Sequence, residues 1–116
     1  MKLQHIQLDQ VQQAINSYAN QDVYLHLETT NGAYAAHNDD KKMTVGAYIR
    51  NGLVQFTRGS IAGEDAYRVG LKLSLGWIYA EGLTHYEIDE QGSLLMAGYD
   101  SEGRLAVALE LSHQPF

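Results

Sequence analysis

The chain has 116 residues and a mass of 12.9 kDa, the size of one domain with its own core. Apolar residues make up 45% of it, which argues against disorder, and a net charge of −6 with scattered Lys and Arg argues against binding to nucleic acid. Without cysteine, disulfides and thiolate metal sites are excluded. Because the sequence shows neither a signal peptide nor an apolar run of membrane-spanning length, we expect a cytoplasmic protein that binds no membrane.

The first predicted element is a helix at about residues 9–19. Asp9 is a suitable N-cap, because its carboxylate can accept the free backbone N–H groups at a helix start. Apolar residues spaced by three or four positions form one stripe, which consists of Leu8, Val11, Ile15 and Tyr18. We expect the helix to dock on the rest of the protein through Val11, Ile15 and Tyr18 of this stripe.

Antiparallel strands joined by hairpins are predicted after the helix. Residues 23–29 alternate between apolar and polar side chains, as a strand with one buried face does. Asn31-Gly32 and Asn51-Gly52 are hairpin turn signals, because both residue types accept positive φ angles. The residues expected in further strands are 33–37, 44–50 and 53–58, followed by a loop at 59–65.

The second half of the chain predicts four more strands. Residues 66–73 alternate between apolar and other side chains, which predicts a strand. Residues 76–88 predict one long strand that contains the single tryptophan. Alternation along that long strand would place one set of side chains on a common face: Trp77, Tyr79, Glu81, Leu83, His85 and Glu87. Residues 93–99 and 104–111 carry few charges, so we expect these strands inside the sheet or at a homodimer interface.

The spacing of turns and the position of glycines indicate the fold class. Turns recur about every eight to twelve residues, which is typical of a sandwich or barrel. Glycines fall inside several predicted strands, where they often mark bulges or bends. The sequence therefore predicts one all-β, mainly antiparallel domain over residues 1–116, with a barrel-like or strongly coiled sheet and one N-terminal helix.

Four long segments of the chain have a familiar sequence: Tyr24 to Tyr34, Tyr67 to Lys72, Gly76 to Thr84 and Gly103 to Leu109. These segments resemble the YojF family of small bacterial proteins. The resemblance implies a mostly-β domain of barrel-like topology, and it implies neither an activity nor site residues, because the family has no established function. Genes of the family can lie near a deacetylase of bacillithiol synthesis, so the resemblance also suggests an accessory role to that enzyme.

Aromatic residues are the strongest indication of a ligand site. The flat apolar body and polar tip of tyrosine allow a cluster to stack a ring-shaped ligand, although ordinary sheet packing is the simpler interpretation. The residues expected at such a site are Trp77, Tyr79, Glu81, His85 and Tyr24. Arg68 and Lys72 share a strand face, which leaves anion binding open there beside the simpler interpretation of solvated charges.

Two His-x-Glu pairs offer a different interpretation. His26 with Glu28 and His85 with Glu87 each lie on one face of a predicted strand. If the two strands were neighbours in register, the four side chains could converge on a divalent metal, for which imidazole and carboxylate are suitable ligands. The simpler interpretation is a solvated strand face with a His–Glu hydrogen bond.

The sequence contains none of the common catalytic motifs, such as a nucleophile elbow, a phosphate-binding loop or a zinc-binding His-Glu-x-x-His. The leading hypothesis is a non-catalytic module that binds a small molecule or a protein partner. A metal-dependent enzyme that uses the His and Glu pairs is the alternative from the residues themselves.

Overall fold

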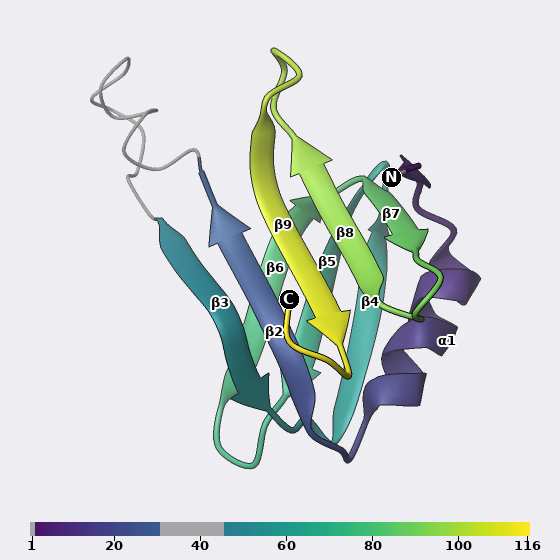
Figure 1. Cartoon of the computed structure of the whole chain (residues 1–116). Helices are drawn as coiled ribbons and strands as arrows, with labels where there is room; N and C mark the ends of the chain where they lie inside the picture. Colours follow the sequence, from purple (N-terminus) through teal and green to yellow (C-terminus); the bar gives the residue numbers. More distant parts are fainter. Residues whose placement is uncertain (1, 31–45) are drawn as a thin grey trace.

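The computed structural model describes residues 2–30 and 46–116 (Figure 1). Within these ranges the chain forms one helix and nine strands. In chain order they are β1 (Gln4–His5), α1 (Leu8–Tyr18), β2 (Val23–Thr29), β3 (Ala47–Val54), β4 (Arg58–Glu64), β5 (Ala66–Lys72), β6 (Trp77–Leu83), β7 (His85–Ile88), β8 (Leu94–Tyr99) and β9 (Leu105–Ser112).

The strands form two antiparallel sheets that pack face to face. The large sheet has the order β1-β7-β8-β9-β2-β3, and the small sheet has the order β4-β5-β6. Figure 1 shows the small sheet behind the large one, with α1 at one side. The sheets do not close into a barrel, and the predicted fold class, mainly antiparallel β with one N-terminal helix, is confirmed. Strands β8 and β9 lie inside the large sheet, as their low charge predicted.

The core lies between the two sheets and under the helix. Val11, Ile15 and Tyr18 of α1 are fully buried, which confirms the predicted docking face. The helix starts one residue earlier than predicted, with Gln7 at the N-cap, and Asp9 lies in the first turn. A carboxylate there still favours the helix, because it faces the positive end of the helix dipole. Within the described ranges no helix is long and apolar enough to cross a membrane.

Helix α1 also covers the open edge of β4. The side-chain amide of Gln12 donates from Nε2 to the carbonyl of Gly59 at 2.9 Å, and its Oε1 accepts the N–H of Ile61 at 3.0 Å. This pair of hydrogen bonds takes the place of a neighbouring strand. Because unpaired strand edges invite association with other chains, Gln12 protects the small sheet on this side.

The predicted hairpin at Asn51-Gly52 is wrong. Strand β3 runs straight through this dipeptide, and its register with β2 shifts beside it, between Leu25 and Leu27. Asn51 has a φ of 58°, which a β-bulge accommodates as readily as a turn does. The expected strand over 53–58 is therefore divided between the end of β3 and the start of β4, and the predicted strand 33–37 lies outside the described residues.

The predicted loop at 59–65 is also wrong, since these residues form most of strand β4. A tight turn at Asp65, where φ is 62°, connects β4 to β5. The two glycines of this segment suggested a loop, but Gly59 is buried against Ile15 of the helix, where a side chain would collide.

The long strand predicted over 76–88 is two strands that belong to different sheets. At Gly82, with φ at 81°, the register with β5 shifts and Leu83 turns into the core. The carbonyl of Gly82 lies so close to Gly98 that a Cβ there would be 1.9 Å away. The expected common face is therefore wrong. Trp77, Tyr79 and Glu81 face outward from the small sheet, Leu83 lies in the core, and His85 lies on the large sheet.

Candidate functional site

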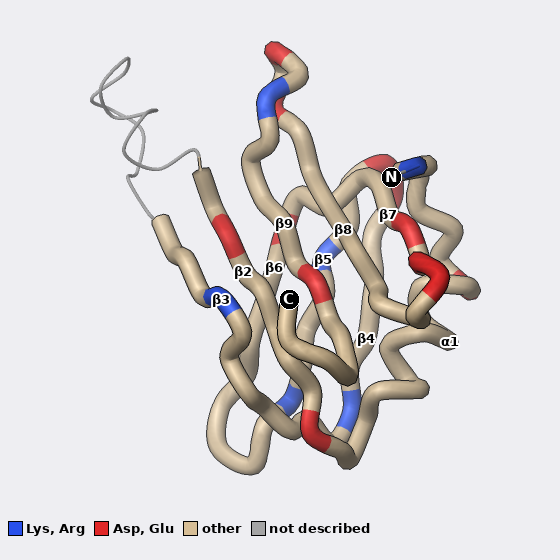
Figure 2. Tube along the Cα trace, viewed as in Figure 1, with Lys and Arg blue, Asp and Glu red and all other residues tan. Residues whose placement is uncertain are grey.

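The outer face of the small sheet gathers aromatic and basic side chains in adjacent rows. Arg58 of β4 pairs with Lys72 of β5, which pairs with Trp77 of β6. In the next row, Gly70 lies opposite Tyr79. We call this surface the aromatic–cationic face and define it as Arg58, Arg68, Lys72, Trp77, Tyr79 and Glu81. Figure 2 shows the basic residues along β4 and β5.

The two rings of this face stack on each other, and each is partly exposed to solvent. The centroids of Trp77 and Tyr79 are 5.6 Å apart and their planes differ by 9°. Gly70 leaves the room for this stack, since a Cβ at that position would lie 2.8 Å from Cε1 of Tyr79. Although the rings pack closely, Trp77 is 40% exposed and Tyr79 is 48% exposed. The stack is thus a fixed aromatic surface that is open to a ligand.

Basic groups flank the stack on both rings. Nζ of Lys72 lies 5.5 Å and Cζ of Arg58 lies 5.7 Å from the Trp77 centroid, and Cζ of Arg68 lies 4.7 Å from the Tyr79 centroid. Each such contact stabilises an exposed pair by about 0.5–1 kcal/mol. Nε of Arg68 also forms an ion pair with Glu81 at 2.7 Å. Arg58 and Lys72, in contrast, have no carboxylate partner within the described ranges.

The outer face of the large sheet carries the first His-x-Glu pair. His26 is buried, with its Nε2 3.5 Å from Oε1 of Glu28 and its Nδ1 3.4 Å from a terminal nitrogen of Arg50. Its ring also meets that of Tyr48 edge-on, with centroids 5.5 Å apart. These contacts account for His26 as a packed and hydrogen-bonded side chain of the sheet.

The second pair lies elsewhere on the same sheet. Strands β8 and β9 separate β7 from β2, which puts the two pairs roughly 14 Å apart at about 4.8 Å per strand. The His85 ring instead meets His5 at 4.4 Å and Tyr99 at 5.3 Å, and Glu87 accepts the backbone N–H of Lys2. Among the residues that the structure describes, no three His, Asp or Glu side chains are grouped so that they could hold a metal ion.

The five residues predicted for a ligand site are thus divided between two faces. Trp77, Tyr79 and Glu81 lie together on the small sheet, whereas His85 and Tyr24 belong to the large sheet. Sequence reasoning did not include Arg58, because its position beside Lys72 depends on the β4–β5 register. The one local signal was Gly70, a glycine inside an alternating strand, which marks the close approach of another group.

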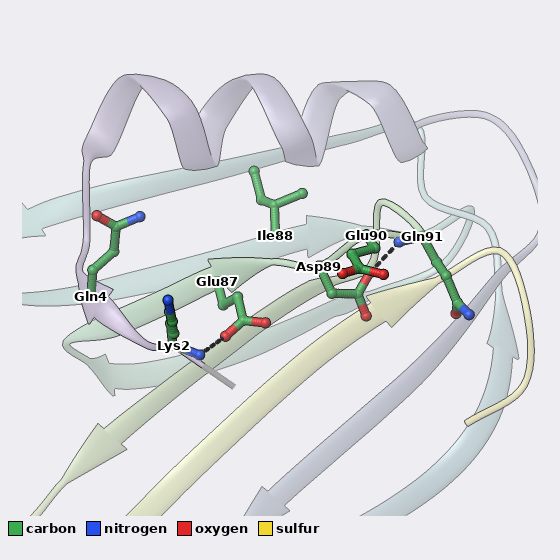
Figure 3. Close-up of a pocket in the computed structure, with 7 residues that line it drawn as sticks. All are labelled: Lys2, Gln4, Glu87, Ile88, Asp89, Glu90 and Gln91. Atoms are coloured by element: carbon green, nitrogen blue, oxygen red, sulfur yellow. Dashed lines mark hydrogen bonds between the residues drawn. The ribbon is translucent and has the colours of Figure 1, made fainter.

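An open pocket of about 590 Å³ lies where β1 meets the end of β7 (Figure 3). Its lining residues are Lys2, Gln4, Glu87, Ile88, Asp89, Glu90 and Gln91. The Asp89 carboxylate accepts the N–H groups of Gln91 and Ser93 at 2.9 Å, which closes the turn into β8. The hydrogen bonds of Asp89 therefore stabilise the turn between β7 and β8.

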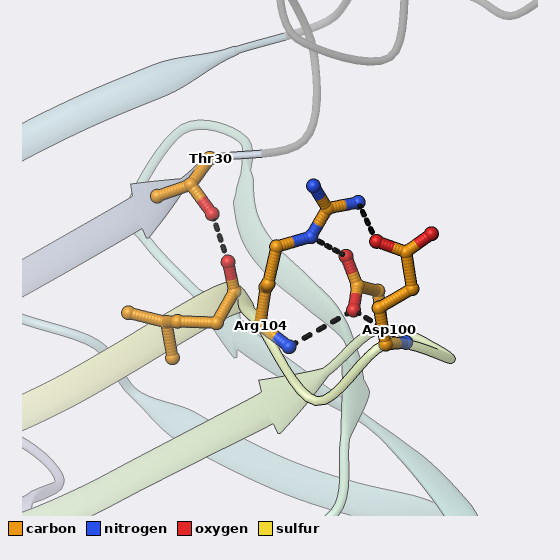
Figure 4. A network of polar contacts seen from close by, with 5 residues as sticks. Thr30, Asp100 and Arg104 are labelled. Atoms are coloured by element: carbon orange, nitrogen blue, oxygen red, sulfur yellow. Dashed lines mark hydrogen bonds and ion pairs between the residues drawn. The ribbon is translucent and has the colours of Figure 1, made fainter. Parts of the chain in front are cut away.

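The turn between β8 and β9 is held by a second carboxylate (Figure 4). Asp100 accepts the N–H groups of Arg104 and Glu102 at 2.9 Å and the Nε–H of Arg104 at 3.0 Å. The backbone N–H of Arg104 is the main cause that lowers the pKa of the Asp100 carboxyl, with Glu102 N–H and the Arg104 guanidinium adding to it. These contacts show that Asp100 stabilises the turn between β8 and β9.

Comparisons with known proteins agree with the architecture. The family model described as "Protein of unknown function (DUF1806)" matches residues 5–116. The uncharacterized protein YojF of Bacillus subtilis (strain 168) is 53% identical over 108 residues, which cover 93% of each chain. The crystal structure of Bacillus subtilis YojF superposes with a TM-score of 0.83 and 46% identity over 100% of this chain and 98% of that one. The chain therefore belongs to the YojF-like family of proteins of unknown function.

Proposed function

We propose that the protein is a non-catalytic cytoplasmic module that binds a small molecule on the aromatic–cationic face. The observation that supports this proposal is the exposed Trp77–Tyr79 stack. It is flanked by Arg58 and Lys72, which have no carboxylate partner among the residues that the structure describes. Aromatic rings with polar neighbours provide a large contact area at a low cost in side-chain entropy, which suits them to binding.

The chemistry of the face favours binding over catalysis. Its Arg and Lys side chains are cationic hydrogen-bond donors with no acceptor atom, which suits them to orienting anions. Glu81, its one carboxylate, is paired with Arg68. The Tyr79 ring packs over Gly70 and against Trp77, and such packing lowers the entropic cost of binding by ordering the rings beforehand.

Trp77 is the single tryptophan of the chain, so intrinsic fluorescence reports directly on this face. The test is a titration of the protein with a panel of uncharged sugars, aromatic carboxylates, nucleotides and sugar phosphates. We expect a saturable change with at least one class. The Tyr79→Ser variant should weaken that binding by roughly 2- to 12-fold, the equivalent of about 0.5–1.5 kcal/mol for an aromatic pair.

The matched control is Tyr48→Ser, which removes another exposed tyrosine, 67% exposed against 48% for Tyr79, from the large sheet. Equal weakening by Tyr48→Ser and Tyr79→Ser would contradict the proposal. A flat fluorescence response to every class would contradict it too, as would a ligand that raises the melting temperature without changing the Trp77 signal. Stoichiometric binding of a protein, with no binding of any small molecule, would contradict the proposal and show that the face binds a protein partner.

A further inference from the structure

We propose that Arg58 and Lys72 form the binding site for the phosphate group of a small phosphorylated ligand. This inference rests on the proposed function, because it names the ligand class of the aromatic–cationic face. The site consists of the two cations and the Trp77 ring beneath them.

The first argument is the register of the two cations. Arg58 lies directly opposite Lys72 in the β4–β5 ladder, where Cβ atoms of paired residues are about 4.5–5.5 Å apart. Like charges in directly opposed positions destabilise a sheet. An anion between the two head groups would convert this repulsion into two attractive contacts.

The second argument is the distribution of charge over the molecule. The chain has 14 Asp and Glu against 8 Lys and Arg, so carboxylates are plentiful. Arg68 and Arg104 are both paired with such carboxylates. Across the described parts of the chain, Arg58 and Lys72 contact the Trp77 ring and no carboxylate, which leaves their N–H groups directed to solvent or ligand.

The third argument is the match in charge and shape. A phosphate monoester carries between one and a half and two negative charges at neutral pH, with three acceptor oxygens. The planar guanidinium of Arg58 suits two of these oxygens, and Lys72 supplies a point charge to a third. Because both head groups lie over the same ring, the organic part of the ligand would rest against the exposed edge of Trp77. A carboxylate, with one charge, satisfies only half of this site.

The experiment compares four probes by Trp77 fluorescence: phenyl phosphate, inorganic phosphate, benzoate and phenol. We expect saturable binding of phenyl phosphate, displacement of it by inorganic phosphate, and at least tenfold weaker binding of benzoate and phenol. Arg58→Gln and Lys72→Gln should each weaken phenyl phosphate by about tenfold or more, as expected for loss of a charge-assisted hydrogen bond. Circular dichroism and the urea midpoint show whether each variant is folded.

The control variant is Arg104→Gln. It removes one positive charge, as Arg58→Gln and Lys72→Gln do, but it does so in the β8–β9 turn. Equal weakening by all three variants would show a general charge effect and overturn the site. Benzoate binding as tight as that of phenyl phosphate would overturn the preference for phosphate. Binding that survives both Arg58→Gln and Lys72→Gln, or a response to uncharged sugars without one to phenyl phosphate, would overturn the phosphate site and leave the proposed binding face intact.

Discussion

The side chain of Gln12 offers the sharpest test of how the small sheet is stabilised. Its amide makes two hydrogen bonds to the edge of β4, at 2.9 Å to Gly59 and 3.0 Å to Ile61, from a position that is only partly buried. The Gln12→Ala variant removes both bonds. Each one contributes about 0.5–1.5 kcal/mol, and water can reach the freed groups, so we expect a loss near the lower end of about 1–3 kcal/mol.

The loss is measurable by urea denaturation and by thermal unfolding. A change of 1 kcal/mol shifts the melting temperature of a domain of this size by roughly 3–5 °C. We expect the urea midpoint to fall. The slope of the unfolding free energy against urea concentration should stay unchanged, since the surface exposed on unfolding stays the same. Amide exchange at Ile61 should become faster, because its N–H loses its acceptor. The open β4 edge should also favour self-association at high protein concentration.

Gln13→Ala is the matched control, because it makes the same substitution at the neighbouring exposed helix position. Gln12→Glu keeps the shape and the acceptor for Ile61 but puts an oxygen beside the Gly59 carbonyl. We expect it to unfold at lower urea than wild type, and Gln13→Ala to match wild type or exceed it slightly through the helix propensity of alanine. Equal midpoints for Gln12→Ala and Gln13→Ala would refute the edge-capping role of Gln12.

Three further predictions concern the core, the aromatic stack and the β8–β9 turn. Ile15→Ala should cost about 2–5 kcal/mol in urea unfolding, because the side chain is fully buried between helix and sheets; a cost below 1 kcal/mol would contradict its core role. Gly70→Ala places a Cβ 2.8 Å from Tyr79 Cε1, so near-ultraviolet circular dichroism of the stacked rings should change, while Gly46→Ala, whose Cβ would meet only the Thr29 carbonyl at 3.8 Å, should leave it unchanged. Asp100 has a lowered folded-state pKa, so its stabilisation is present above the ordinary value of 3.8 and is lost as the pH falls through the folded value. Asp100→Asn should therefore be less stable than wild type at pH 7 and equal to it in strong acid, and a stability gap that persists in acid would refute this sign.

The sequence predicted those parts of the fold that depend on local pattern. The apolar stripe of α1 and the alternation of β2 are each set by side chains within a few residues, so their bounds were predicted to within a residue. Asn51-Gly52 was misread because positive φ serves both a hairpin and a bulge, and the choice is made by the partner strand β2. Gly59 was misread because a glycine also suits a strand that another element packs against closely.

The division of the 76–88 segment had a similar cause. Alternation continues through it in the sequence, but Gly82 introduces an extra residue against β5, and this reverses the direction of the side chains that follow. At this bulge Gly82 lies against Gly98 of β8, a contact between residues 16 positions apart. A pattern that is read along one strand does not contain that contact.

The difference between local pattern and strand pairing also explains which part of the candidate site could be predicted from the sequence. Trp77, Tyr79 and Glu81 lie on one strand, so their common face follows from alternation alone. Arg58 reaches them across two strand pairings, Arg58 to Lys72 and Lys72 to Trp77, and each pairing is fixed by a turn whose geometry the sequence left open. The turn at Asp65 and the burial of Gly59 and Ile61 on the inner face of β4 together set the first of these registers, which keeps Arg58 on the outer face. The charge pair on which the phosphate site depends is thus a property of the β4–β5 turn as much as of the two basic residues.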